Sequence, residues 1–140
     1  MTAKQYLSQI RKLDMMINQR IDEAEALIEI AVGLRSPELK QDVIQASPSG
    51  DPIGNAMNRY IDLQREINDM IDQFVNLKHK IIGEINAVPD TRYSELLYHR
   101  YVEHMSFAQI AEVMHYEYKY ICHLHGEALK CFQKARTNTN

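Results

Sequence analysis

This chain of 140 residues carries 16 Lys and Arg against 19 Asp and Glu, which gives a net charge of -3 at pH 7. That balance argues against a strongly basic nucleic-acid-binding protein, and no apolar run approaches the roughly 18 residues that suggest a membrane span. The few Gly (5) and Pro (4), the absence of Trp and the many Ile, Leu, Met, Glu and Gln predict an all-α protein.

The length allows one domain, or a long helical segment and a small terminal module. The first residues lack the charged, apolar and cleavage regions of a signal peptide, so we expect a cytoplasmic protein without a membrane partner. The cysteines, Cys122 and Cys131, would fall on opposite sides of one helix at about 100° per residue. We expect both to stay reduced, as thiols do in the cytoplasm.

From about Ala3 to Leu34, apolar residues recur at alternating steps of three and four, with Arg20 as the one interruption. Such spacing is typical of the seam of a coiled coil or of a long hairpin helix. A helix of roughly 30 residues extends about 45 Å, and a seam of that length needs a partner helix. The seam consists of Ile10, Leu13, Ile17, Ala24, Leu27, Ala31 and Leu34.

Residues 35–52, read RSPELKQDVIQASPSGDP, form the one extended break in this pattern and hold three of the four prolines. We predict a loop of about 17 residues, which is either a plain connector or a functional segment, as long loops often are. Asp51 and Pro52 then provide an N-cap and a first helical residue for the next element.

Residues 53–88 predict a second long helix, whose apolar stripe is wider than one neighbouring helix can bury. We therefore expect residues 1–88 to form a long antiparallel helical hairpin, coiled-coil-like, that pairs with a second copy as a homodimer. Gln64 and Lys78 are polar at seam positions, and either set the register of that assembly or mark the exposed ends of a drifting seam. The expected dimer interface contains Ile10, Leu13, Ile17, Ile67, Ile71 and Phe74.

Residues 89–136 predict a small three-helix module. Pro89 stops the preceding helix, and Asp90 caps a helix over about 91–103. After the module, residues 137–140 are expected to form a frayed tail, because the last stretch has no apolar content.

The second half of this module has the pattern of a helix-turn-helix, in which the second helix enters the major groove of DNA. Ser106, followed three residues later by Gln109, caps a short helix that ends at a break at His115 and Tyr116. The helical run after the break places one set of apolar residues on a single face: Ile121, Leu124, Ala128, Leu129 and Phe132.

The phrase FAQIAEVMHYEYKYICHLHGEAL resembles region 4 of bacterial sigma factors. With the upstream phrases YLSQIRKLD, VIQASPSGDPIGN, LKHKIIGEIN and PDTRYSELLYHRYVE, it makes the chain similar to small phage-encoded proteins with a sigma region 4-like C-terminus, such as the ArpU and RinA types of late transcription regulator. The resemblance implies a regulator that binds double-stranded promoter DNA in the host cell cytoplasm while touching host RNA polymerase. The chain departs from that pattern at Glu117, where sigma region 4 has Ser or Thr.

If Ile121 and Leu124 face the core, their neighbours project from the first turns of the last helix, the part that meets base edges in helix-turn-helix proteins. The candidate DNA-binding residues are Tyr118, Lys119, Tyr120, His123 and Lys130. The carboxylate of Glu117 stands where a phosphate would meet the helix dipole. The alternative is therefore a protein-binding adaptor that engages RNA polymerase or another regulator without reading DNA.

No Gly-rich phosphate loop, nucleophile elbow or His-Glu-x-x-His motif occurs, so we expect neither an enzyme nor a cofactor nor a small-molecule substrate. One group of residues has side chains of the types that bind zinc. Because the group lacks the paired spacing of zinc sites, we expect no metal. The group comprises His115, Cys122, His123, His125 and Cys131, which we interpret as half-buried thiols and solvated imidazoles.

Overall fold

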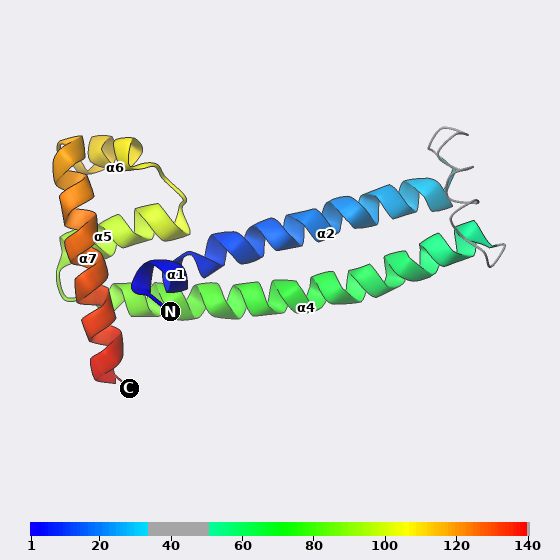
Figure 1. Cartoon of the computed structure of the whole chain (residues 1–140), viewed down its shortest axis with the longest axis horizontal. Coiled ribbons are helices and arrows are strands. Elements are labelled where there is room, and N and C mark those ends of the chain that lie inside the picture. The colour runs from blue at the N-terminus through cyan, green and yellow to red at the C-terminus, as the bar shows by residue number, and fades with distance from the viewer. Residues whose placement is uncertain (34–50, 140) are drawn as a thin grey trace. The chain divides into compact units, whose positions relative to one another are not determined.

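In the computed structural model, which describes residues 1–33 and 51–139, every regular element is a helix, so the all-α prediction is confirmed for this part of the chain (Figure 1). Leu34 and the predicted loop at residues 35–50 lie outside the described residues. None of the helices formed by residues 1–33 and 51–139 has the length and apolar character that a bilayer span requires. The elements are α1 (Ala3–Leu7), α2 (Gln9–Ala31), α4 (Pro52–Asn86), α5 (Thr91–Leu97), the π-helix η1 (Tyr98–Val102), α6 (Phe107–Met114) and α7 (Tyr118–Thr139).

The chain divides into two compact units, and the boundaries fall inside α2 and α4. We call Met1–Asp14 with Phe74–Asn140 the terminal unit, and Met15–Gln73 the middle unit. The predicted boundary at residue 88 is therefore not where the units divide, because the last part of α4 packs with the C-terminal helices in one core.

The first predicted helix is divided at Ser8 into α1 and α2. The Ser8 hydroxyl donates to the Lys4 carbonyl at 2.7 Å, and the Ser8 N–H also bonds to that carbonyl at 3.0 Å. Side-chain bonds of this kind bend helices, and the division between α1 and α2 falls at the residue that makes one. At the start of α1, Thr2 and Gln5 form a reciprocal capping box, with bonds of 2.9 and 3.1 Å.

In the middle unit, α2 and α4 pack around a small apolar core. Two ion pairs join them, Arg20 with Glu66 at 3.1 Å and Arg59 with Glu23 at 3.3 Å. Since the residue number rises along α2 while its partner's number falls along α4, the two segments run antiparallel. Both pairs are partly exposed and stabilise the unit little, so burial of apolar surface holds it together. The core consists of Ala24, Leu63 and Ile67, with Ile21, Leu27 and Tyr60 against it.

The predicted start of α4 is confirmed. Asp51 Oδ1 accepts from the Gly54 N–H at 3.0 Å, and Pro52 is the first helical residue. A Cβ on Gly54 would clash with Asp51 Oδ2, so the missing side chain leaves room for the capping carboxylate.

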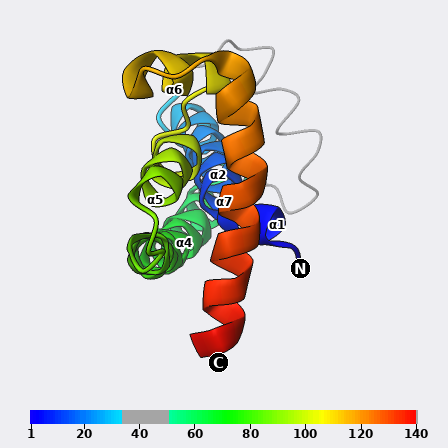
Figure 2. The same cartoon turned by 90° about the vertical axis from the view of Figure 1, so that its left-hand side faces the viewer.

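The terminal unit has two apolar clusters. The larger joins α1, the start of α2, the end of α4, the end of α5, η1 and α7. The smaller joins α5, α6 and α7, which lie together in Figure 2. The larger cluster includes Leu7, Ile10, Ile81, Ile85, Leu97 and Phe132, and the smaller consists of Leu96, Ile110, Ala111, Ile121 and Leu124.

The helix predicted over residues 91–103 begins as expected but does not stay α-helical. Asp90 Oδ1 accepts from the Arg92 N–H at 2.9 Å, which confirms the predicted N-cap. From Tyr98 the chain widens into a π-helix, in which the Glu103 N–H bonds to the Tyr98 carbonyl at 3.1 Å. The π turn ends with Tyr101 and Val102 both buried in the larger cluster.

The C-terminal residues also differ from expectation, because α7 continues to Thr139 instead of fraying from residue 137; residue 140 lies outside the described residues. Arg136 Nε donates to Glu84 Oε2 at 3.0 Å, and its guanidinium lies 3.5 Å from the centre of the Tyr6 ring. The Tyr6 hydroxyl donates to the same carboxylate. This network anchors the last turns of α7 to α1 and α4.

The six expected dimer residues occupy different environments within the single chain. Ile10, Ile17 and Ile67 are buried by the chain itself, so they serve its own core. Leu13 and Phe74 are half-buried, and Ile71 remains 38% exposed. Association with a second copy stays a prediction, and Ile71 is the one of the six that offers it an exposed apolar side chain.

Candidate nucleic-acid interface

The turn between α6 and α7 is built by local signals at both ends of α6. Ser106 and Gln109 form a reciprocal capping box, with bonds of 3.2 and 2.9 Å, as the sequence predicts. The helix ends at His115, whose backbone is left-handed (φ 60°, ψ 42°). The Tyr116 N–H bonds back to the Ala111 carbonyl at 3.0 Å. Residues 115–117 thus reverse the chain, and α7 begins at Tyr118.

Burial on one side of α7 leaves its opposite side open to solvent. Ile121 and Leu124 pack on Ile110 and Ala111 of α6, together with Leu96 of α5. As a consequence, the candidate residues Tyr118, Lys119 and His123 are exposed, Tyr118 by 55%. Cys122 is exposed beside them. A hydrogen bond with Cys122 raises the pKa of Tyr118.

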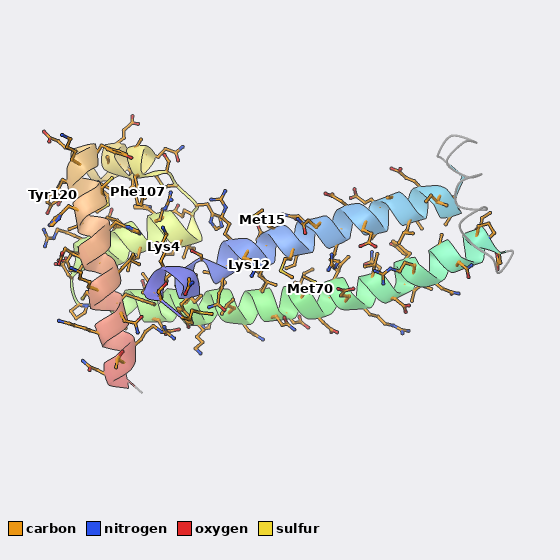
Figure 3. All side chains as sticks on the ribbon, in the orientation of Figure 1. Lys4, Lys12, Met15, Met70, Phe107 and Tyr120 are labelled. Atoms are coloured by element: carbon orange, nitrogen blue, oxygen red, sulfur yellow. The ribbon has the colours of Figure 1, made fainter. Side chains whose placement is uncertain are left out.

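Tyr120 differs from the other candidates because it is half-buried and committed to the fold. Its hydroxyl accepts from Arg92 Nη1 at 2.8 Å, and its ring centre lies 4.8 Å from that of Tyr116. Figure 3 labels Tyr120 at the start of α7 and Phe107 at the start of α6. Tyr120 therefore helps to position the exposed turns of α7 more than it offers a free side chain to a ligand.

Arg92 was not among the sequence candidates, although the contact with Tyr120 brings it to the first turns of α7. It also pairs with Asp90 through Nη2 and Oδ2 at 3.0 Å, and this hydrogen-bonded pair lowers the pKa of Asp90. Arg92 and Tyr120 are separated by 28 residues, so no local pattern could have indicated the contact. Arg92 adds a cation beside the candidate surface.

Lys130 lies farther along α7, and its side chain is 77% exposed. Its Nζ is 3.6 Å from Glu127 Oε1, an exposed pair of the kind that contributes little to stability. At 1.5 Å per residue, Lys130 stands about 18 Å along the helix from Tyr118. On an extended partner molecule, Lys130 would therefore contact a different segment from the one that Lys119 contacts.

The predicted solvated state of His125 is wrong, because this imidazole is half-buried. Its Nε2 lies 2.7 Å from the Tyr101 hydroxyl, and its ring centre is 4.8 Å from that of Phe107. Burial, aided by the charges of Arg100 and Lys4, lowers the pKa of His125 to about 4. The ring is neutral at pH 7 and belongs to the packing of the unit. Among residues 1–33 and 51–139, no three His, Cys, Asp or Glu side chains converge in a way that could hold a metal ion.

The candidate surface thus consists of exposed polar and aromatic side chains on the first turns of α7, with Arg92 beside them and Lys130 beyond. Glu117 precedes the helix and is exposed, so a negative charge also borders the surface. Comparisons with protein-family models, with curated proteins and with solved structures each find no match to this chain.

Proposed function

We propose that this protein is a phage-type transcription regulator that binds promoter DNA through a helix-turn-helix formed by α6 and α7. The observation that carries the proposal is the placement of the first turns of α7. One side packs on α6 after a turn of three residues, while Tyr118, Lys119 and His123 stand exposed on the other. An exposed helical ridge of this kind fits the major groove, which is about 12 Å wide.

The exposed side chains have distinct roles in this proposal. Lys119 donates to guanine or to a phosphate, and the Tyr118 phenol provides one donor and an apolar edge. His123 adds a second donor. Lys130 contacts a phosphate outside the groove. Tyr120 holds the helix in place through Arg92.

Glu117 weakens the interaction that each copy makes with DNA. Its carboxylate lies before the first turn of α7, where the helix dipole would otherwise attract a phosphate. We propose that a homodimer compensates, because two linked modules on two half-sites bind far more tightly than one. In this proposal the antiparallel helices α2 and α4 provide the dimer contact, and the DNA-bound protein touches host RNA polymerase in the host cytoplasm.

The test is a mobility-shift titration with late-promoter DNA and with a random duplex of equal length. The double variant Lys119→Ala/His123→Ala should lose at least about tenfold in promoter affinity. The matched control is Lys80→Ala/His79→Ala, which removes the same two residue types from exposed positions on α4. The proposal fails if the wild type binds both duplexes equally, or if the two double variants lose affinity to the same extent.

A second candidate, a protein-binding adaptor, is favoured by the apolar side chains exposed around the turn. Val113 is 49% exposed, Tyr116 38% and Tyr118 55%, and this group borders Glu117. Apolar surface of this kind suits a protein partner better than a phosphate backbone. The adaptor would be supported if the wild-type protein retains nuclease-treated RNA polymerase subunits in a pull-down and the Val113→Ser variant does not. Failure to retain any subunit would count against it.

A further inference from the structure

Gly126 lies in the interior of α7 on its solvent-exposed side, and no contact within residues 1–33 and 51–139 requires a glycine there. A Cβ built at Gly126 would meet no atom of the described residues within 4 Å. The residue is exposed and its backbone is helical. Glycine is among the least favourable residues in a helix interior, because it loses the most conformational freedom on folding. A glycine that the fold does not need is useful where another molecule's backbone must approach closely.

The side chains that share this face of α7 are basic. Lys119 and His123 precede Gly126 by seven and three residues, and Lys130 and Lys134 follow by four and eight. At about 100° per residue, these spacings place all four on the same side of the helix as Gly126. All four are exposed.

This face carries little opposing charge. Glu127 is the one acidic residue between Tyr118 and Thr139, and it pairs with Lys130 at 3.6 Å. An exposed pair at that distance is weak, so a phosphate can replace the carboxylate at small cost. The charge of the surface around Gly126 therefore favours a polyanion over a protein helix.

We take α7 to run across the major groove with its first turns inside it, and this orientation brings Gly126 to the groove edge. From Tyr118 to Gly126 the helix rises about 12 Å, which matches the groove width of about 12 Å. The sugar-phosphate backbone borders the groove at that distance. Lys130 and Lys134 follow about 6 and 12 Å farther along the same side, within reach of phosphates beyond the edge.

We propose that one strand of duplex DNA crosses α7 at Gly126, where the missing side chain lets the sugar-phosphate backbone approach the helix backbone. Lys130 and Lys134 then bind phosphates of the crossing strand, and Lys119 and His123 lie on the groove side of the crossing. This inference rests on the proposed DNA-binding function and adds the position and direction of the duplex on α7.

The experiment compares two glycines in equivalent surroundings. Gly83, inside α4, is also exposed, and a Cβ there would likewise meet no atom within 4 Å in the part of the chain that the structure describes. Gly126→Ala and Gly83→Ala should both raise the thermal midpoint measured by circular dichroism, because alanine favours the helix. Gly126→Leu should weaken promoter binding, followed by fluorescence anisotropy, by about tenfold, and Gly126→Ala by a smaller factor. Gly83→Ala and Gly83→Leu should bind as the wild type does.

A second measurement tests the lysines of the crossing. Lys130→Ala and Lys134→Ala should each lower the slope of log affinity against log salt by about one, whereas Lys80→Ala, on α4, should leave it unchanged. If Gly126→Leu binds promoter DNA as tightly as Gly83→Leu does, the proposed strand crossing at Gly126 is wrong. Promoter binding by the wild type is not contradicted by that result. A wild type without DNA affinity overturns the crossing and the proposed function together. Loss of RNA polymerase capture by Gly126→Leu, with DNA affinity intact, also overturns the crossing.

Discussion

The Tyr101 hydroxyl lies 2.7 Å from Nε2 of His125, and this contact joins the π-helix η1 to α7 at the level of α6. The two rings are stacked, with their centres 5.8 Å apart. Burial raises the pKa of Tyr101 to about 12 and, with the nearby cations, lowers the pKa of His125 to about 4. Both groups are therefore neutral at pH 7, and the contact is a hydrogen bond between uncharged partners.

The terminal unit should lose stability as the pH falls from about 7 towards 4. The pKa of His125 drops from 6.5 to about 4 on folding, so over this interval the unfolded chain binds more protons than the folded one. The stability that His125 contributes is fully present above pH 6.5 and is lost as the pH falls. The groups that face it are the Tyr101 hydroxyl and the cationic side chains of Arg100 and Lys4.

Thermal unfolding followed by circular dichroism between pH 4 and 7.5 checks this expectation. His125→Gln removes the titrating group, so its midpoint should fall less with acid than that of the wild type. His79→Gln, at an exposed position on α4, is the control and should follow the wild type. Equal acid dependence in His125→Gln and the wild type would show that His125 is not buried in its neutral form.

His115→Gly should stabilise the protein by about 1 kcal/mol, because a left-handed backbone costs a residue with a Cβ roughly that much. His115 has φ 60° at the C-terminus of α6, and its side chain is exposed. His115→Ala keeps the Cβ and should match the wild type. Urea unfolding gives the free energies, and a glycine variant no more stable than the alanine variant would contradict the assignment of the turn.

Arg136→Met should destabilise the terminal unit by about 1–3 kcal/mol, because it leaves the half-buried Glu84 carboxylate without its charged donor. Arg65→Met, at an exposed position on α4, is the matched control and should cost less than about 0.5 kcal/mol. In urea unfolding, the double variant with Glu84→Gln should cost less than the sum of the single changes. Additive costs would mean that Arg136 and Glu84 do not interact.

If the protein forms the proposed homodimer, Ile71→Asp should convert it to a monomer. Ile71 is 38% exposed and, of the residues expected at the interface, offers the most open apolar side chain. Gln73→Asp, an exposed polar position on the same helix, should leave the mass unchanged. Sedimentation equilibrium gives the mass of each form. A wild type that sediments as a monomer at all concentrations would contradict the dimer.

Local sequence signals predicted the helix starts well. Asp51, Asp90 and Ser106 each cap a helix where the sequence indicates, because a cap depends on residues within one turn. The break at Ser8 coincides with a hydroxyl that bonds back to the preceding turn. The serine alone did not indicate that break, since serine also occurs within regular helices.

The features that the sequence did not indicate join residues distant in the chain. Arg136 anchors the end of α7 through Glu84, which lies 52 residues earlier, so the tail appears polar and unattached in the sequence. On the candidate surface, helical periodicity correctly predicted that Tyr118 and Lys119 are exposed. It could not show that Tyr120 contacts Arg92 or that His125 is half-buried against η1.

Promoter recognition by α7 is tested most directly by anisotropy titration of a labelled late-promoter duplex and of its shuffled sequence, each at about 50 and 200 mM salt. We expect the wild type to prefer the promoter by at least about 100-fold at the higher salt, and Lys119→Ala/His123→Ala to lose most of that preference. Equal affinity for the two duplexes, or a preference that the double variant retains in full, would contradict DNA reading by this helix.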